Sequence, residues 1–265
     1  MKLKLPNWGS LCNPNLLLNS DFKSGIINQK GQTSYTSISL SPLYTIDRWK
    51  LSGNGKVIVN NGYIRIESTS SGTLYFTQDL DDVINENCIS YANIKAFSGD
   101  IGFAIIGNGG NNKTVKISKT GDILNQYNEC KSITFSITGN SSYVEIYTVK
   151  LEKGLLFTGV PVWNKKLELF KCQYNGVLVK SYNPFSARAD GTYMSFLIPC
   201  MEMRKTPSIK NNKLFIIGNG ESTSYTGEIT CINTPNGIRC VFNYRKVGSY
   251  VVCFEQDTFI DSNDY

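Results

Sequence analysis

The chain has 265 residues, a length between that of one large β domain and that of two ordinary domains. Only 18% of the residues are charged, and the net charge of +6 comes from 27 basic and 21 acidic residues. There is no histidine, which excludes Ser-His-Asp and Cys-His triads, histidine zinc ligands and histidine general bases. Because the basic residues form no dense block, we expect no nucleic-acid groove. The composition favours a protein that is not an enzyme and needs no cofactor.

The start of the chain, residues 1–7, lacks a long apolar segment, so we expect no cleaved secretory signal. No apolar run approaches the roughly 20 residues of a membrane-spanning helix. The sequence therefore predicts a soluble protein without membrane insertion.

The chain contains eight cysteines and no Cys-x-x-Cys pair. Several of them lie within apolar, strand-like runs, where a free thiol behaves as a small hydrophobic side chain. We interpret them as reduced core residues of a protein made in a cytoplasm. Cys231 and Cys240 flank a turn at 235–237 and could face each other across a hairpin, and whether they form a disulfide stays open.

Residues 1–160 contain short runs of β-branched and aromatic residues, separated by Gly, Asn and Ser turn formers such as Asn61-Gly62. Nine short strands without a helical period between them are typical of a β-sandwich or jelly roll. The expected strands are 44–51, 56–60, 63–69, 73–80, 88–97, 101–106, 114–118, 132–138 and 143–151. Within them, Trp49 is predicted to be a core residue.

The pattern changes at 163–174, where Leu167, Phe170 and Tyr174 recur at helical spacing. Asn164 is a suitable N-cap and Gly176 a suitable C-terminal stop, so the sequence predicts one helix. This gives an N-terminal jelly-roll domain at 1–160, a connecting helix at 161–176 and a small C-terminal β-sandwich at 177–265. The apolar side of the helix has two interpretations: it fills the seam between the domains, or it meets copies of itself about a symmetry axis.

For the C-terminal domain, the sequence predicts a loop through 183–191, followed by strands at 192–198, 208–217, 227–232, 237–244 and 249–254. The run Ile216-Ile217-Gly218-Asn219-Gly220 is interpreted as a strand end leading into an Asn-Gly turn. So few strands leave exposed sheet edges, which oligomerisation would cover. The chain is therefore expected to be a homo-oligomer.

Three further motifs contain residue types that could bind a ligand or a metal ion. The glycines at 107–110 lack the Lys-Ser/Thr of a phosphate-binding loop and are interpreted as a turn. Asp79, Asp81 and Asp82 supply hard oxygen ligands suited to calcium, but their spacing fits no EF-hand, and a surface turn is the alternative. No metal site is predicted. Aromatic side chains outside or at the edges of strands could stack on sugar rings, and these are Trp8, Tyr35, Tyr44, Tyr193, Tyr225 and Tyr244.

Three stretches, in a fixed order, give the sequence its individuality. The first is NLLLNSDF at 15–22, followed by INQKG at 27–31 and YTIDRW at 44–49. The second is VKLEKG at 149–154, which leads through Thr158-Gly159 to LELFKCQY at 167–174, and the third is Ser195-Phe196 with MEMRKTP at 201–207. Together they resemble bacteriophage and prophage tail-fibre or minor structural proteins. The resemblance implies a carbohydrate-binding-module-like jelly roll, joined by a short helix to a small β domain.

What the resemblance further implies is a virion component, often a trimer, that is displayed on a tail appendage and used for host attachment. We therefore expect a tail-fibre or receptor-binding subunit that contacts other virion proteins and a cell-surface glycan. Leu167, Phe170 and Tyr174 are the candidate trimer interface. The alternative is an architectural virion protein, a capsid or tail decoration or a collar or ring component, without glycan binding. A carbohydrate-active enzyme is the least favoured interpretation.

Overall fold

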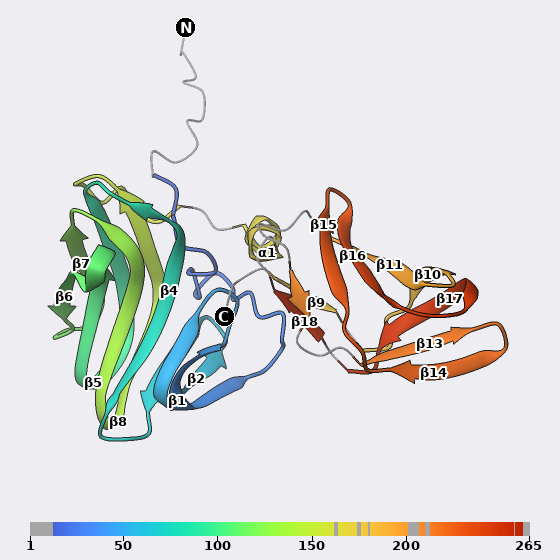
Figure 1. Cartoon of the computed structure of the whole chain (residues 1–265). Coiled ribbons are helices and arrows are strands. Elements are labelled where there is room, and N and C mark those ends of the chain that lie inside the picture. The colour runs from blue at the N-terminus through green and yellow to red at the C-terminus, as the bar shows by residue number, and fades with distance from the viewer. Residues whose placement is uncertain are drawn as a thin grey trace, which may run out of the picture. The chain divides into compact units, whose positions relative to one another are not determined.

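The computed structural model describes residues 13–161, 164–173, 176–179, 181–200, 207–209, 213–256 and 258–261. The chain divides into two compact units, Met1–Glu168 and Leu169–Tyr265, drawn from blue to yellow and from yellow to red in Figure 1. Strands dominate both units, so the predicted all-β, sandwich-type fold is confirmed. No helix in the described part of the chain has the length and apolar character needed to cross a membrane.

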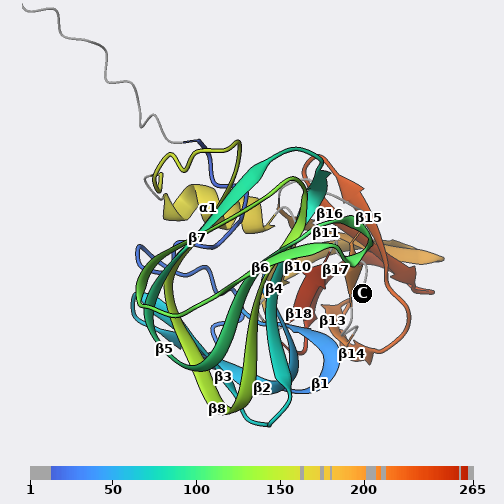
Figure 2. The same cartoon turned by 90° about the vertical axis from the view of Figure 1, so that its left-hand side faces the viewer.

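The first unit is an eight-stranded antiparallel sheet whose longest strands, β5 and β8, pair along most of their length. The sheet order is β1-β2-β3-β8-β5-β6, while β4 pairs with β2 and β8, and β7 pairs with β5. Figure 2 shows these long strands curving through the unit. The strands are β1 Ser34–Tyr44, β2 Lys50–Asn60, β3 Tyr63–Ser68, β4 Thr73–Ile84, β5 Cys88–Ile106, β6 Asn112–Lys116, β7 Gly121–Tyr127 and β8 Cys130–Lys153.

The long strands β5 and β8 run through both layers of the unit, because each strand changes its pairing partners part-way along its length, at a bend that we call the corner. The first half of β5 pairs with β7 and the second half of β8, whereas its second half pairs with β6 and the first half of β8. The register shifts between Ser98 and Asp100, where Gly99 adopts a φ of 90°. A Cβ at Gly99 would lie 2.1 Å from the Ser142 hydroxyl, so the corner requires glycine.

Trp49 lies fully buried in the core between these layers, as predicted. Its ring stacks on Phe76 at a centroid distance of 4.6 Å and an interplanar angle of 3°. Its Nε1–H donates to the backbone carbonyl of Asn19 at 3.0 Å, which satisfies the polar atom of the indole. The tryptophan therefore ties the segment before β1 to the sandwich core.

The asparagines of the NLLLNSDF stretch bind backbone groups that no strand satisfies. Asn15 Nδ2 donates to the Val149 carbonyl at 2.9 Å, and its Oδ1 accepts from Leu151 N at 3.0 Å. Asn19, at a φ of 48°, donates through Nδ2 to the Ile27 carbonyl and accepts from Ile27 N, both at 2.7 Å. This stretch is thus a structural anchor on β8.

The VKLEKG stretch contains a fully buried ion pair. Lys150 Nζ lies 2.9 Å from Glu152 Oε2 and also donates to the Gly159 carbonyl at 2.6 Å. Burial opposes ionisation of Glu152, but hydrogen bonds from Thr158 and Lys150 outweigh it and hold the carboxyl pKa below its ordinary value. The pair fastens the segment after β8 onto the strand and faces no solvent.

The helix α1, Lys165–Gln173, confirms the predicted element with slightly shorter bounds. Asn164 Oδ1 accepts from Leu167 N at 3.1 Å, which is the expected N-cap bond. The Leu167 side chain is half exposed. The Phe170 side chain and Tyr174, the other candidate interface residues, lie outside what the structure describes.

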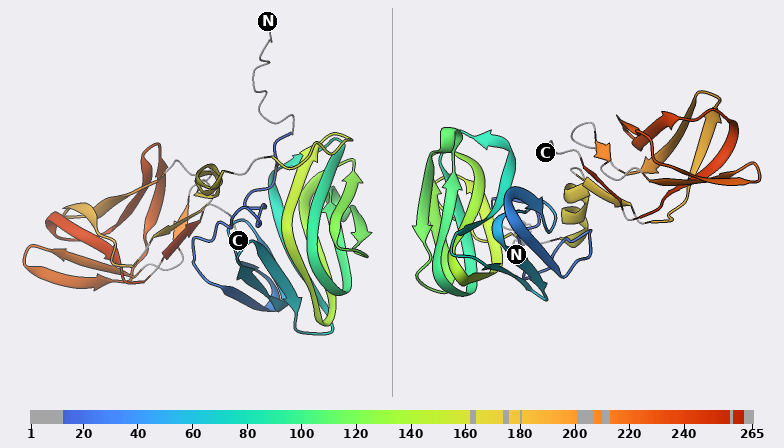
Figure 3. Two further views of the ribbon diagram at one scale, coloured as in Figure 1. Left: turned by 180° about the vertical axis from the view of Figure 1, so that it is seen from behind. Right: turned by 60° about the horizontal axis from the view of Figure 1, so that its bottom comes forward.

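The second unit contains a seven-stranded antiparallel sheet of order β14-β13-β17-β10-β11-β16-β15 and a three-stranded sheet of order β12-β18-β9. In Figure 3 the orange and red strands of this unit form curved sheets. The strands are β9 Gly176–Val179, β10 Phe185–Asp190, β11 Tyr193–Pro199, β12 Ser208–Ile209, β13 Leu214–Gly218, β14 Glu221–Tyr225, β15 Thr230–Thr234, β16 Gly237–Asn243, β17 Val247–Phe254 and β18 Thr258–Asp261.

The seven-stranded sheet curls so that strands near its two ends touch. Tyr225 on β14 packs on Phe242 of β16 with ring centroids 4.5 Å apart. Phe196, on the interior strand β11, contacts both Phe242 and Phe254 edge-on. The side chains on the inner face thereby form one buried core.

Two sequence predictions in this unit were wrong. The expected loop at 183–191 contains β10, a central strand, because Ala187 and Ala189 are small enough to fill the core face at alternate positions. The strand β14 was not predicted, since its sequence ESTSY lacks an apolar face. Asn219 and Gly220, at φ values of 53° and 75°, make the predicted turn that leads into it.

Truncation of Trp49 tests the core of the first unit. Trp49→Ala is expected to lower the free energy of unfolding by about 3–5 kcal/mol, because it leaves a cavity beside Phe76. Trp49→Phe keeps the ring and is expected to cost about 1–3 kcal/mol, since the Asn19 carbonyl loses its donor. Urea unfolding followed by circular dichroism measures both. The exposed Leu155→Ala serves as control, and equal effects of W49A and L155A would contradict the assignment.

Candidate functional site

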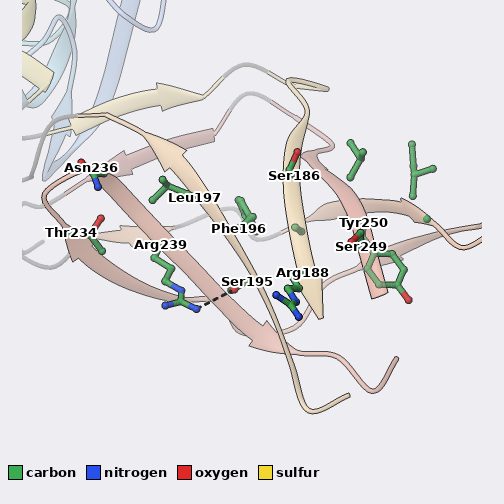
Figure 4. A pocket seen from close by; sticks show the side chains of 14 residues that line it. Ser186, Arg188, Ser195, Phe196, Leu197, Thr234, Asn236, Arg239, Ser249 and Tyr250 are labelled. Carbon is green, nitrogen blue, oxygen red and sulfur yellow. Dashed lines mark hydrogen bonds between the residues drawn. The ribbon is translucent and has the colours of Figure 1, made fainter. Parts of the chain in front are cut away.

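A hollow of about 940 Å³ lies against the seven-stranded sheet of the second unit (Figure 4). Its volume is within the range of small-molecule sites. Strands β10, β11, β13, β16 and β17 and the β15–β16 turn contribute to it, and we call it the outer-face hollow. Its lining consists of Ser186, Ala187, Arg188, Ser195, Phe196, Leu197, Ile217, Gly218, Thr234, Asn236, Arg239, Ser249, Tyr250 and Val251.

Strand alternation decides which side chains reach the hollow. On β10, Ala187 and Ala189 are buried while Ser186 and Arg188 are exposed, because successive residues point to opposite faces. The same alternation on β11 buries Phe196 and leaves Leu197 exposed. The sheet thus has an inner face that forms the core and an outer face that presents these polar and apolar side chains.

Two arginines lie on the outer face on either side of Ser195. Arg188 is the direct cross-strand partner of Ser195 on the β10–β11 pair. From β16, Arg239 Nη2 donates to Ser195 Oγ at 3.4 Å, the dashed line in Figure 4. No acidic residue lines the hollow, and within the part of the chain that the structure describes neither guanidinium forms an ion pair. The hollow is therefore positively charged.

Apolar side chains border the arginines. Leu197 is opposite Arg239 on the β11–β16 pair, and Ile217 is opposite Val251 on the β13–β17 pair. These three aliphatic side chains are 40–46% exposed, which is high for residues of their size. Ser186 on β10 lies between Leu197 and the Ile217–Val251 pair, so the outer face alternates apolar and polar side chains. Exposed apolar side chains beside polar groups are typical of a binding surface.

The hollow offers groups that bind but few that transfer protons. Apart from its two arginines, the only titratable side chain in its lining is Tyr250, which is buried and whose hydroxyl contacts Asn219 Nδ2 at 2.9 Å. A serine nucleophile needs an adjacent general base, and glycoside hydrolysis needs two carboxyl groups. The lining supplies neither, so its geometry supports binding.

The predicted tyrosines of the second unit lie outside this lining. Tyr193 is exposed, whereas Tyr225 packs on Phe242 and donates its hydroxyl to the Glu228 carbonyl at 3.1 Å. Tyr244 contacts Tyr250 edge-on at 5.3 Å. Burial raises the pKa of both Tyr225 and Tyr244. Of the three, Tyr193 alone offers an open ring.

In the first unit the prediction for Tyr35 was wrong. Its side chain is only 3% exposed, and its hydroxyl donates to Asn28 Oδ1, so it presents no face to a sugar. Burial, together with the charge of Asp47, raises the pKa of Tyr35 to about 12. Tyr44 is half-buried, with Lys50 Nζ 5.3 Å from its ring centroid. Trp8 lies outside the described residues.

Other tyrosines of the first unit form a surface that sequence reasoning missed. Tyr63 and Tyr143 lie on β3 and β8, with Lys95 Nζ 3.8 Å from the first ring centroid and the Arg65 guanidinium 3.6 Å from the second. Both cations also pair with Glu145. Each ring thus has a cation on one face, and both cations are already paired with Glu145, so this surface offers fewer unpaired charges to a ligand than the outer-face hollow.

The acidic run in β4 does not gather into a metal site. Asp79 pairs with Lys50, and Asp81 pairs with Arg48 at 2.7 Å. The run lies where the β4–β8 register shifts, between Asp79 and Ile84. Among the described residues no three His, Cys, Asp or Glu side chains are grouped to hold a metal ion. The alternative prediction of a surface turn was wrong, because the run lies within strand β4, where two of its carboxylates pair with basic side chains.

Sequence reasoning also missed Arg188, Ser195 and Arg239. Alternation between small apolar and polar residues in FSARAD is the signal that would have placed Arg188 on an outer face. Nothing in the sequence indicates that β10, β11 and β16 are neighbours, and this adjacency is what brings the two arginines to the same serine.

The comparisons with known proteins leave the family open. No protein family and no curated protein matches the sequence. Partial structural likenesses include an arabinose-bound α-L-arabinofuranosidase, MgGH51, at 16% identity and a TM-score of 0.30, and PfGH50B at 10% and 0.31. They cover 52% and 61% of this chain, but only 26% and 36% of those chains. A fucolectin from striped bass, Morone saxatilis, has 10% identity and a TM-score of 0.26, over 75% of this chain and 85% of its own. At such TM-scores these likenesses carry no functional argument.

Cys231 and Cys240 face each other as directly opposite residues of the β15–β16 hairpin. Both are buried free thiols. A hydrogen bond between them lowers the pKa of Cys231 and raises that of Cys240. The register would permit a disulfide, but the structure holds the reduced form.

A thiol count tests the reduced state. Protein purified in air should show all eight thiols on titration after unfolding in guanidinium, because the described cysteines are free and mostly buried in the fold. Titration with a chromogenic disulfide reagent measures this count. The double variant Cys231→Ser, Cys240→Ser has six cysteines. If the wild type shows only six of its eight thiols while the double variant shows all six of its own, the two missing thiols form a disulfide in this hairpin.

Proposed function

We propose that this chain is a bacteriophage virion protein, a tail-fibre or receptor-binding subunit that attaches to a glycan on the host surface. The observation that carries the attachment role is the outer-face hollow, where Arg188, Arg239 and Ser195 adjoin exposed Leu197 and Val251. Sugars present hydroxyl groups on their edges and C–H groups on their faces, and this lining supplies partners for both.

The virion role rests on the resemblance in sequence. Two of the stretches that carry it, NLLLNSDF and VKLEKG, contain the Asn15 and Asn19 anchors and the Lys150–Glu152 pair. These contacts hold the first unit together, so the two stretches serve its fold and say little about a ligand. The ligand site is assigned from the geometry of the second unit.

Attachment by a virion does not require a tight individual site. A shallow hollow that binds weakly becomes effective when several copies engage one cell, because the later binding events occur at a high effective concentration. We infer binding without catalysis, since the hollow presents no carboxyl group and no general base to a bound sugar.

The alternative function is architectural, as a capsid or tail decoration or a collar or ring component. The exposed Leu197, Ile217 and Val251 favour it, because the same apolar patch could pack on a neighbouring virion protein. Such a contact would leave the two arginines without partners unless the neighbour contributed acidic groups. This is why glycan attachment is preferred.

Binding to surface polysaccharides tests the function. The full chain, coupled to a multivalent particle, is expected to bind at least one member of an array of bacterial surface polysaccharides. Periodate cleavage of the sugar diols should abolish that binding. Absence of binding across the array, together with capture of purified virion proteins, would favour the architectural alternative.

Solution mass tests the oligomer. Light scattering coupled to size exclusion is expected to give the mass of three chains. Leu167→Asp should dissociate the trimer by placing a charge at the helix interface, whereas Leu155→Asp, on another exposed leucine, should leave it intact. A monomer, or a trimer unaffected by L167D, would exclude an α1 interface that includes Leu167.

A further inference from the structure

We infer that the outer-face hollow selects an anionic saccharide, one that carries a carboxylate or a phosphate group, and that Arg188 and Arg239 bind that anion. This inference rests on the proposed function, because it names the class of glycan that the same site takes. Its first support is the charge of the hollow, which contains two guanidinium groups and no acidic side chain.

The arrangement of the two arginines indicates that both could bind the same anionic group of a ligand. Arg188 is directly opposite Ser195 on one neighbouring strand, and Arg239 reaches the same serine by a 3.4 Å hydrogen bond from the other. A serine hydroxyl satisfies only one N–H of a guanidinium, which has five donors in a fixed fork. The remaining donors suit the paired oxygens of a carboxylate or phosphate.

Electrostatics also favours an anion at this place. Arg188 on β10 and Arg239 on β16 lie on the same face of the sheet, on the two strands that flank β11, and two cations placed so repel each other. Several cations on the sheet of the first unit are neutralised by acidic side chains: Arg65 and Lys95 share Glu145, and Lys50 pairs with Asp79. The described part of the second unit provides no such acid to Arg188 or Arg239, so a ligand anion would neutralise them.

The rest of the lining fits a sugar better than a free ion. Ser249 is the cross-strand partner of Arg188, and Thr234 and Asn236 lie on the hairpin beside Arg239, so hydroxyl and amide groups surround the cations. Leu197 and Val251 supply apolar area for the C–H face of a ring. A hollow of about 940 Å³ also exceeds what a single inorganic anion would fill.

The anion could come from two sources, a carboxylate-bearing sugar or a phosphodiester-linked polymer. The test therefore uses three immobilised polymers: a polyuronate, a glycerol-phosphate polymer and a neutral dextran. Binding to each polymer is measured for four forms of the full chain: the wild type, Arg188→Gln, Arg239→Gln and Arg245→Gln. Arg245 is an exposed arginine outside the hollow, so its variant changes the net charge equally and controls for non-specific attraction.

We expect the wild type to bind one of the two anionic polymers and not dextran, and the polymer that binds identifies the source. R188Q and R239Q should each weaken that binding at least about tenfold, because each removes a charge-assisted contact. R245Q should change it less than about twofold. These exposed substitutions are expected to leave the thermal unfolding midpoint unchanged, which shows that the fold is intact.

Three results would overturn the inference. Binding to neutral saccharides that R188Q and R239Q do not affect would leave glycan attachment standing but remove the anionic class. Equal losses in all three arginine variants would show non-specific attraction between a basic chain and a polyanion. Failure of a multivalent form to bind any polysaccharide, including the surface array, would remove the proposed function itself.

Discussion

The second unit depends on one constraint: its seven-stranded sheet has a single face buried. Phe196, Phe242 and Phe254 meet on the inner face, and the curl of the sheet brings Tyr225 from β14 onto the same cluster. The apolar side chains that stabilise the unit are thus committed to that face. Strand alternation then sends every second residue outward, where packing does not dictate its identity. The outer face is free to carry arginines, serines and exposed aliphatic groups, and that freedom allows the binding surface that we propose.

The first unit shows the opposite use of a sandwich. Several of its charged and aromatic side chains contact one another, as in the buried Lys150–Glu152 pair and in the network around Glu145 that includes Tyr63 and Tyr143. Trp49 and Asn19 hold the segment before β1 to the core. These contacts stabilise the fold of the first unit. With the proposed site on the second unit, the first unit would serve as the scaffold of a protein that displays a weak site in several copies.

The sequence predicted the fold class because its signals are local. Asn-Gly turns and β-branched runs indicate strands, and Asn164 with the spacing after it predicted α1. Predictions failed where tertiary packing decides: β10 has a weak strand sequence, yet it lies at the centre of a sheet because Ala187 and Ala189 fit the core. Tyr35 failed for the same reason, since nothing local distinguishes a buried tyrosine from an exposed one. The site could not be predicted, because Arg188 and Arg239 meet only through the order of non-consecutive strands.

The most direct test of attachment through the second unit is a hydrogen-exchange footprint of the full chain, with and without a bound surface polysaccharide. We expect slower exchange in β10, β11 and β16, around Arg188, Ser195 and Arg239, and unchanged exchange in the first unit. Protection confined to the first unit, for example around Tyr63 and Tyr143, would contradict this expectation and move the attachment site to the jelly roll.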